Sequence, residues 1–282
     1  MYSIALDWMS FTLKGLQDET LVLQTITPDG EISPVTPTNG YKRAVASNIG
    51  IQLHINPDRP EMGLHVVIPG SSLRLLEQSG TSTRRMLQIA VQAGALFTRI
   101  DLAKDAKDER ISLWEIYSAC ERHERSGTAQ KIRQWREPDG GHTIYVGAPS
   151  SDAQCRLYNK AAESHVEGDW VRMEFQARND VAKAWARVLS QDNADWNALL
   201  CGKVGKMLNI DVDGYNRWLG GAATEGLPQI EKRSDREAWI LKQVIPAILE
   251  HIRTNPNSDA VKLLISSIEF AKSGRGGILN ET

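Results

Sequence analysis

Arg156, Tyr158 and Lys160 alternate along the segment QCRLYNK, so an extended strand would place all three side chains on one face. A phenol between two cations has its anion stabilised, which predicts a lowered tyrosine pKa and a more nucleophilic oxygen at neutral pH. The same cations could hold a phosphate group. The segment therefore indicates either a tyrosine nucleophile beside a phosphate site or an ordinary exposed strand face.

Two further segments place carboxylates on strands. In TRIDLAKD, Arg99 and Asp101 share one face of a strand that is apolar enough to be central, and Asp105 follows. In DWVRMEFQAR, Arg172 and Glu174 share a face opposite apolar neighbours. A carboxylate on a central strand is costly unless it is paired or binds a metal. These carboxylates are therefore candidate ligands of a hard divalent cation; the alternatives are an ion pair at the sheet rim and an ordinary surface glutamate.

Together, the three polar strand faces supply two carboxylates, one phenol and several cations. That inventory suits metal-assisted phosphoryl transfer through a covalent tyrosine. Other chemistries lack their motifs. The segment LLCGKVGKM lacks the glycine spacing and the Ser or Thr of a Walker A loop, and GxGxxG, GxSxG and HExxH are absent. The six histidines are scattered, with no HxH pair.

The elements that would position these segments are mostly strands up to about residue 177. Apolar residues alternate with polar ones in short runs, and the runs are interrupted by helical patterns. This order predicts an α+β fold, a mostly antiparallel sheet with flanking helices. Residues 27–40, rich in Pro, Gly and Asn, predict a loop. The expected strands are 4–13, 21–26, 51–55, 64–68, 95–105, 131–137, 142–147, 154–160 and 169–178, and the expected helices are 71–80, 82–94 and 111–123.

After residue 178 the pattern becomes helical. Amphipathic runs predict helices over 179–191, 234–252 and 257–274, the second beginning with a capping box from Ser234 to Glu237 and kinked at Pro246. We therefore expect two domains. Residues 1–178 would form a strand-rich domain that carries the three polar segments, and residues 179–282 would form a helical C-terminal region.

Composition narrows the class of protein. The chain has 282 residues, of which 41% are hydrophobic and 24% charged, so it can bury a core and is not disordered. Its net charge of −2 argues against coating nucleic acid through charge alone, although a local basic patch remains compatible. Eight tryptophans against four phenylalanines leave room for stacking on bases.

Membrane and export signals are absent from the sequence. No apolar run approaches the roughly 18 residues of a membrane span, and the N-terminus lacks the layout of a signal peptide. Cys120, Cys155 and Cys201 form an odd, scattered set without CxxC spacing. These features predict a soluble, cytoplasmic protein with reduced thiols.

Five segments in a fixed order resemble the replication initiation factor family. They are DWMSFT, GLHVVIPGSSLRLLE, TRIDLAKD, TIYVGAPSSDAQCRLYNKAAE and VRMEFQAR. That family includes initiators of small rolling-circle plasmids, relaxases of some integrative conjugative elements, and phage proteins. The resemblance spans roughly residues 5–180, and family members vary in the helical remainder.

The resemblance implies a DNA strand nickase. In such enzymes a tyrosine attacks a phosphodiester at the origin, stays joined to the 5′-phosphate and leaves a 3′-hydroxyl for a polymerase. The family's R-x-Y-x-K motif falls on Arg156, Tyr158 and Lys160, which makes Tyr158 the expected nucleophile. Tyr145, in TIYVG, is the rival nucleophile.

The resemblance also implies a metal site. The family's R-x-D falls on Arg99 and Asp101, and its R-x-E falls on Arg172 and Glu174. Asp101 and Glu174 are then the expected ligands of Mg²⁺ or Mn²⁺, with Asp105 as a further ligand, while the two arginines would contact DNA.

Two more positions bear on the comparison with the family. Glu163 closes the Y-x-K-x-x-E pattern, as a ligand or a support. Plasmid members often carry an acidic residue between the tyrosine and the lysine, whereas this chain has Asn159. The departure leaves open a metal site that is weaker or differently built, and a relative without catalytic activity.

The expected partners follow from the same resemblance. They are origin DNA (single-stranded or hairpin), a host helicase, and a second copy of the chain, since a homodimer would suit a palindromic or hairpin site. The alternative to a nickase is a non-catalytic DNA-binding regulator on the same scaffold. A third interpretation is an unrelated structural or interaction protein whose polar strand faces are only surface.

Overall fold

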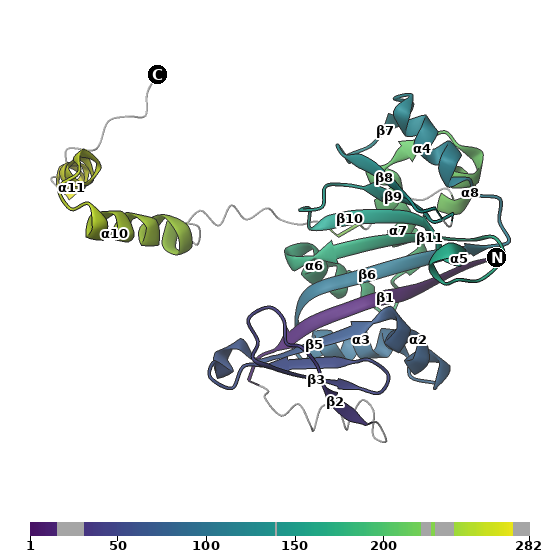
Figure 1. The fold of residues 1–282 in the computed structure, drawn as a ribbon, viewed down its shortest axis with the longest axis horizontal. Coiled ribbons are helices and arrows are strands. Elements are labelled where there is room, and N and C mark those ends of the chain that lie inside the picture. The colour runs from purple at the N-terminus through teal and green to yellow at the C-terminus, as the bar shows by residue number, and fades with distance from the viewer. Residues whose placement is uncertain (16–30, 139, 221–226, 229–239, 273–282) are drawn as a thin grey trace. The chain divides into compact units, whose positions relative to one another are not determined.

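The structure is a computed structural model, and it describes residues 1–15, 31–138, 140–220, 227–228 and 240–272 (Figure 1). Its main feature is a ten-stranded sheet with the order β2-β3-β4-β5-β1-β6-β11-β10-β9-β8, in which every pairing is antiparallel. The strands are β1 (Tyr2–Leu13), β2 (Ile32–Pro34), β3 (Arg43–Ser47), β4 (Gln52–Ile55), β5 (Leu64–Pro69), β6 (Leu96–Lys107), β8 (Ile132–Arg136), β9 (His142–Val146), β10 (Ala153–Asn159) and β11 (Trp170–Arg178).

Helices flank this sheet, and a two-stranded sheet joins β7 (Arg125–Ser126) to β12 (Asn209–Ile210). The expected α+β class with a mostly antiparallel sheet is therefore confirmed. The helices are η1 (Pro60–Met62), α2 (Gly70–Gln78), α3 (Thr83–Gln92), α4 (Leu113–Glu121), α5 (Lys160–Glu163), α6 (Asn179–Leu189), α7 (Trp196–Met207), α8 (Asp213–Leu219), the π-helical turn η2 (Ile240–Val244), α10 (Ile245–Thr254) and α11 (Asp259–Lys272).

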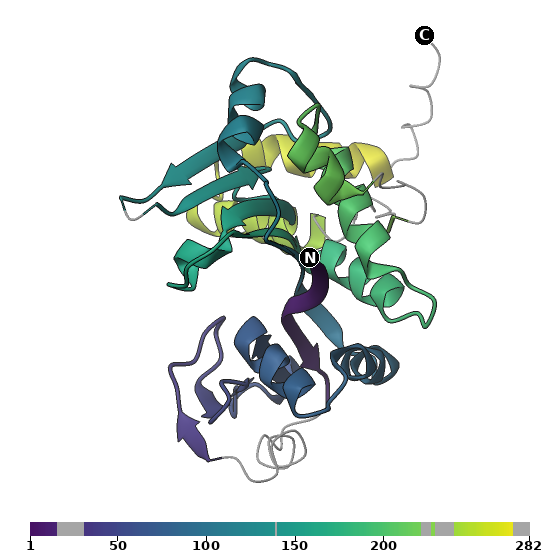
Figure 2. The same cartoon turned by 90° about the vertical axis from the view of Figure 1, so that its right-hand side faces the viewer.

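The core lies between one face of the central strands and the helices that follow them. α6 contacts β6 and β11, and α7 contacts β6. The amphipathic pattern of α6 explains this packing, since Trp185 is 2% exposed and its ring lies 4.6 Å from the ring of Phe175 on β11. In Figure 2 the green helices that follow β11 gather along one side of the sheet. The opposite face of the central strands is left to polar side chains.

Two local expectations were wrong. Residues 32–34, expected in a loop, form the edge strand β2, which pairs with the unanticipated β3. An edge strand tolerates Pro34, which has no backbone N–H to donate to a neighbouring strand. This explains why a proline-rich stretch can contain a strand. Lys160, expected at the end of a strand, begins α5, because the Asn159 side chain accepts a hydrogen bond from the Ala162 N–H at 3.0 Å and caps the helix.

The C-terminal helices only partly overlap the described residues. The expected strand 21–26 and the Ser234–Glu237 capping box lie outside them. The interruption expected at Pro246 is present as the turn η2, directly before α10, and the proline occupies the first turn of α10, where its missing N–H costs least.

The chain divides into two compact units, Met1–Ile230 and Glu231–Thr282. The division differs from the expected boundary at 178/179. Its physical reason is that α6 and α7 bury their apolar residues against the sheet, which joins them to the first unit. No helix among the described residues has the length and apolar character needed to cross a bilayer.

Candidate active site

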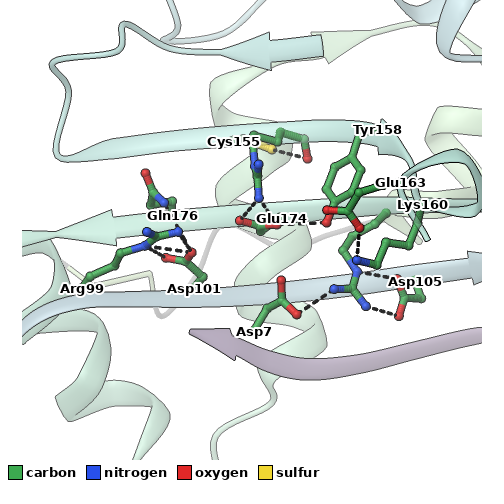
Figure 3. A network of polar contacts seen from close by, with 12 residues as sticks. Asp7, Arg99, Asp101, Asp105, Cys155, Tyr158, Lys160, Glu163, Glu174 and Gln176 are labelled. Atoms are coloured by element: carbon green, nitrogen blue, oxygen red, sulfur yellow. Dashed lines mark hydrogen bonds and ion pairs between the residues drawn. The ribbon is translucent and has the colours of Figure 1, made fainter. Parts of the chain in front are cut away.

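The polar face of β6, β11 and β10 brings the three predicted segments together (Figure 3). Across β10 and β11, Arg156 lies opposite Glu174 and Tyr158 lies opposite Arg172. Across β11 and β6, Arg172 lies opposite Asp105. Directly opposed residues of an antiparallel pair project to the same side, so the register alone assembles the cluster.

Tyr158 is held by Glu174 rather than by its neighbouring cations. Its phenolic OH donates to Oε2 of Glu174 at 3.2 Å, and Nη2 of Arg156 donates to both oxygens of the same carboxylate at 2.7 and 2.6 Å. Glu174 is 1% exposed and Tyr158 is 4% exposed. The cluster is thus a buried phenol, carboxylate and guanidinium in contact.

The prediction that the pKa of Tyr158 is lowered was wrong. Burial raises the pKa of its phenol well above the usual value, and the negative charge of Glu174 raises it further. The positive charge of Arg172 lowers it, but by less. Alternation along the strand correctly places cations near the ring, but it does not reveal that a carboxylate would contact the hydroxyl. The phenol therefore needs a proton acceptor before it can act as a nucleophile.

Lys160 reaches the same cluster from the first turn of α5. Its Nζ lies 5.8 Å from the centre of the Tyr158 ring and forms an ion pair with Glu163. Lys160 is buried, whereas the side chain of Glu163 is half exposed. The R-x-Y-x-K-x-x-E pattern is therefore one local structure, a strand that runs directly into a capped helix.

Asp101 lies on the adjoining part of the face and is paired. Nε of Arg99 donates to its two oxygens, each at 3.0 Å, and Gln176 donates to Oδ2 at 3.4 Å. Burial raises the pKa of the Asp101 carboxyl, and the Arg99 hydrogen bonds act against that rise. Arg99 also lies over the ring of Trp8, with its guanidinium carbon 4.4 Å from the ring centre. The expected Arg99–Asp101 ion pair is present, on a central strand.

Asp7 is a member of the cluster that sequence reasoning missed. Nη1 of Arg172 donates to Oδ1 of Asp7 at 2.6 Å, while its Nε and Nη2 donate to the two oxygens of Asp105 at 2.7 and 2.8 Å. The register between β1 and β6 shifts between Leu6 and Trp8, and this bulge turns Asp7 toward the polar face. The apolar alternation of β1 changes phase at the same point, a signal that could have located it.

The carboxylates fit a divalent cation in ligand type and in charge. Burial is the largest cause that raises the pKa of Asp7 and the pKa of Asp101. The negative charge of Glu174 also raises the pKa of Asp7, and the negative charge of Asp7 also raises the pKa of Asp101. Hard carboxylate oxygens are the ligands that Mg²⁺ and Mn²⁺ prefer. In the described residues each of these carboxylates is paired with an arginine, and no three metal-ligating side chains gather closely enough to hold an ion.

Donors without partners lie beside the cluster. Nε of Arg156, Nε2 of Gln154 and Nε1 of Trp170 are buried and have no acceptor. Gln154 lies two residues from Arg156 on β10, and therefore on the same face. A buried unpaired donor costs roughly 1–3 kcal/mol. These donors are therefore suited to form hydrogen bonds with the oxygens of an anion.

Tyr145 lies on the same face as Tyr158, one strand farther out. It is directly opposite Arg156 across β9 and β10 and is half-buried. The guanidinium carbon of Arg133 lies 5.2 Å from its ring centre. The rival tyrosine is thus more open to solvent than Tyr158.

Fold and site together define a protein with an antiparallel sheet whose polar face gathers a tyrosine, paired carboxylates and arginines. Residues 95–216 match the family model described as "Replication initiation factor". The matched range contains Asp101, Tyr158 and Glu174, and it confirms the resemblance noted in the sequence.

A curated protein and a solved structure are also similar to this chain. The chain is 30% identical over 116 residues to the "Putative DNA relaxase NicK" of Bacillus subtilis (strain 168), which covers 34% of this chain and 31% of that protein. The chain therefore spans about a third of the length of this curated relative. A solved structure, a rolling-circle replication initiator protein from Geobacillus stearothermophilus, superposes with a TM-score of 0.67 at 22% identity, over 82% of this chain and 100% of that one. At this identity the likeness concerns the fold.

Proposed function

We propose that this protein nicks one strand of DNA at an origin, as a replication initiator or relaxase of a mobile element, and that Tyr158 is the nucleophile. The observation that carries the proposal is the hydrogen bond from the Tyr158 phenol to Glu174, at 3.2 Å, inside an arginine-rich face. The family match over residues 95–216 and the names of the relatives support the choice of DNA as substrate.

Glu174 is the proton acceptor in this proposal. Because the pKa of Tyr158 is raised by burial, a free phenolate is scarce at neutral pH, and the proton must pass to a neighbour as the oxygen attacks. The phenolic oxygen then bonds to phosphorus while the bond from phosphorus to the 3′ oxygen breaks. The departing 3′ oxygen takes up a proton, and the 5′-phosphate stays esterified to Tyr158.

Arg156 and its neighbours would hold the phosphate. Nε of Arg156 and Nε2 of Gln154 are buried donors without acceptors, so they can bind the non-bridging oxygens, where charge builds during attack. Lys160 adds a positive charge beside the Tyr158 ring. Arg99, whose side chain is 29% exposed, is the more accessible candidate for DNA contact, whereas Arg172, at 5%, would mainly position carboxylates.

Asp101 and Glu174 would hold a Mg²⁺ or Mn²⁺ ion, and Asp7 is a third candidate that the fold adds. When bound, the ion supplies positive charge that stabilises the phosphate in the transition state. Asp105 remains a further candidate, with both of its oxygens engaged by Arg172. Metal binding would require the arginines to release carboxylate oxygens, which predicts a site that loads together with DNA.

The proposed partners are origin DNA, a second copy of this chain and a host helicase. The helical C-terminal region is assigned to DNA recognition or assembly. The second candidate function is a non-catalytic DNA-binding regulator on the same scaffold. The observations that favour it are the burial of Tyr158 and the presence of Asn159 where plasmid members often carry an acidic residue.

An adduct assay tests the proposal. Supercoiled plasmid carrying this gene and its flanks is incubated with the protein and Mn²⁺ or Mg²⁺, beside Tyr158→Phe and Tyr145→Phe. We expect nicked circles with protein covalently attached, absent in Tyr158→Phe and retained in Tyr145→Phe. The reverse pattern would make Tyr145 the nucleophile. Specific binding without a nick in the unaltered protein would favour the regulator.

A further inference from the structure

The face that carries Tyr158 continues outward to the edge of the sheet. Across β10, β9 and β8, Tyr158 lies opposite Thr143, and Thr143 lies opposite Trp135. All three side chains therefore project to one side. Strands are spaced about 4.8 Å apart, so Trp135 lies two strands, or about 10 Å, from the proposed nucleophile.

A second row runs parallel to the first. Arg156 lies opposite Tyr145, and Tyr145 lies opposite Arg133. The Arg133 guanidinium stacks over the Tyr145 ring at 5.2 Å. The outer end of the face thus joins a cation and two aromatic rings to the buried cluster, without a break in the sheet.

Exposure rises along both rows toward the edge. Tyr158 is 4% exposed, Thr143 is half-buried and Trp135 is 63% exposed. In the other row the Arg156 side chain is 33% exposed, Tyr145 is half-buried and Arg133 is exposed. The face opens outward from the buried cluster.

We infer that Trp135 and Arg133 bind the unpaired nucleotides that flank the scissile phosphate, with a base stacked on the indole and a phosphate paired with the guanidinium. The inference rests on the proposed function for the identity of the scissile phosphate. Bases of a single strand can reach an aromatic ring, whereas bases inside a duplex are stacked on one another. The exposed cation Arg133, beside two aromatic rings, matches that ligand in charge and in shape.

The side chains of β8 also favour a nucleic-acid site over an edge strand whose charges serve only to prevent pairing with another sheet. Charged side chains commonly protect an edge strand from pairing with another sheet, and this accounts for Arg133 and Arg136. It does not account for an indole that is mostly exposed between them. A large aromatic surface at such a position is what a stacking site requires.

Binding of a fluorescein-labelled oligothymidylate tests the inference by anisotropy, without any cleavage. We expect Trp135→Ala to weaken binding by between about fivefold and a hundredfold, the range of one lost base stack, and Trp135→Phe to restore most of it. Arg133→Gln should weaken binding and make it less dependent on salt. A duplex of the same length should respond much less to Trp135→Ala.

Two variants serve as matched controls. Trp114 is another exposed tryptophan, 54% exposed, and the guanidinium carbon of Arg136 lies 4.3 Å from its ring centre. Arg136 projects from β8 to the opposite side from Arg133 and Trp135. Trp114→Ala and Arg136→Gln should each weaken binding less than their counterparts. All variants are compared after their thermal unfolding has been checked.

The outcomes separate this inference from the proposed function. Equal binding by Trp135→Ala and the unaltered protein would overturn the inference, as would equal losses in Trp135→Ala and Trp114→Ala. Loss of oligothymidylate binding in Trp135→Ala supports it even where no adduct forms in the plasmid assay. If the unaltered protein forms the adduct and Trp135→Ala binds the oligothymidylate normally, the proposed nickase function would hold and the inference about Trp135 and Arg133 would be wrong.

Discussion

The carboxylate of Glu174 accepts hydrogen bonds from both Tyr158 and Arg156. An isosteric substitution therefore tests its proposed role as the proton acceptor of Tyr158. Glu174→Gln keeps the shape and a hydrogen-bond acceptor but removes the proposed proton acceptor and one proposed ligand of the metal ion. We expect the initial nicking rate to fall by about 10²- to 10⁴-fold, the usual worth of general base catalysis. The rate is measured on supercoiled plasmid as nicked product against time.

Glu163→Gln is the matched control for that change, because Glu163 is a half-exposed carboxylate whose ion pair is with Lys160. It should retain most of the rate. Circular dichroism checks that Glu174→Gln is folded, since the change leaves Arg156 without its anionic partner. A folded Glu174→Gln protein that nicks at the unaltered rate would contradict the assignment of Glu174.

For single residues, spacing in the sequence predicts which side chains share a face of a strand but not which atoms they contact. Period-two alternation correctly places Asp101 and Glu174 on the polar sides of β6 and β11, because a strand has no other way to project them. Asp7 escapes that reasoning because a bulge changes the period. The direction of the Tyr158 pKa shift also escapes it, since burial and the contact with Glu174 depend on the neighbouring strand.

The cap of α5 connects a single residue to the geometry of an element. Asn159 caps the helix that begins with Lys160, so Asn159→Ala should cost about 1 kcal/mol of unfolding free energy and loosen the position of Lys160. Asn159→Asp should keep the cap, because aspartate caps as well as asparagine. Urea unfolding measures both. Equal stability of Asn159→Ala and the unaltered protein would contradict the capping role.

The strands β4 and β5 hold a pair of buried histidines, His54 opposite His65, with Thr12 hydrogen-bonded to Nδ1 of His65 at 3.0 Å. Burial, and then the charge of His54, lowers the pKa of His65 to about 4, while an unfolded histidine titrates near 6.5. Between these values the unfolded chain binds more protons. The stability that His65 contributes is therefore complete above about pH 6.5 and is lost as pH falls toward about 4.

This pair gives a pH-dependent prediction. The unfolding free energy of the unaltered protein should fall by ~2 kcal/mol more than that of His65→Phe between about pH 7 and about pH 5. Urea unfolding at both pH values measures the difference. His123→Gln, at an exposed histidine, should keep the full dependence. A His65→Phe protein with an unchanged pH dependence would show that His65 does not titrate as described.

Among the elements, the long strands and α6 were predictable, whereas the helix α7 (Trp196–Met207) was missed and the packing of the late helices was not predictable. The alternation of β1, β5, β6 and β11 and the amphipathic pattern of α6 identify each element locally. The change from strands to helices near residue 178 indicates a boundary, yet α6 buries its apolar stripe on the sheet that precedes it. An amphipathic pattern reports that a face is buried and not which partner buries it.

At the scale of the whole molecule, the second compact unit leaves apolar side chains uncovered. On its described helices Leu249 is 60% exposed and Leu263 is 69% exposed, and Ile265 is exposed as well. An apolar side chain that is exposed in one copy of a protein can be buried against a second copy. We propose that a homodimer forms through this unit, which would give a palindromic or hairpin origin two copies of the polar face, as in symmetric DNA-binding proteins.

The dimer is tested on the full chain. Light scattering should give about twice the 31.3 kDa chain mass, and Leu249→Glu combined with Leu263→Glu should give the single-chain mass, because a buried charge opposes association. Ile89→Glu changes an exposed apolar residue on α3 of the first unit and should leave the dimer intact. The double variant should still bind the oligothymidylate, since β8 lies in the first unit, but should bind a palindromic site more weakly. An unchanged mass in the double variant would move the dimer interface elsewhere.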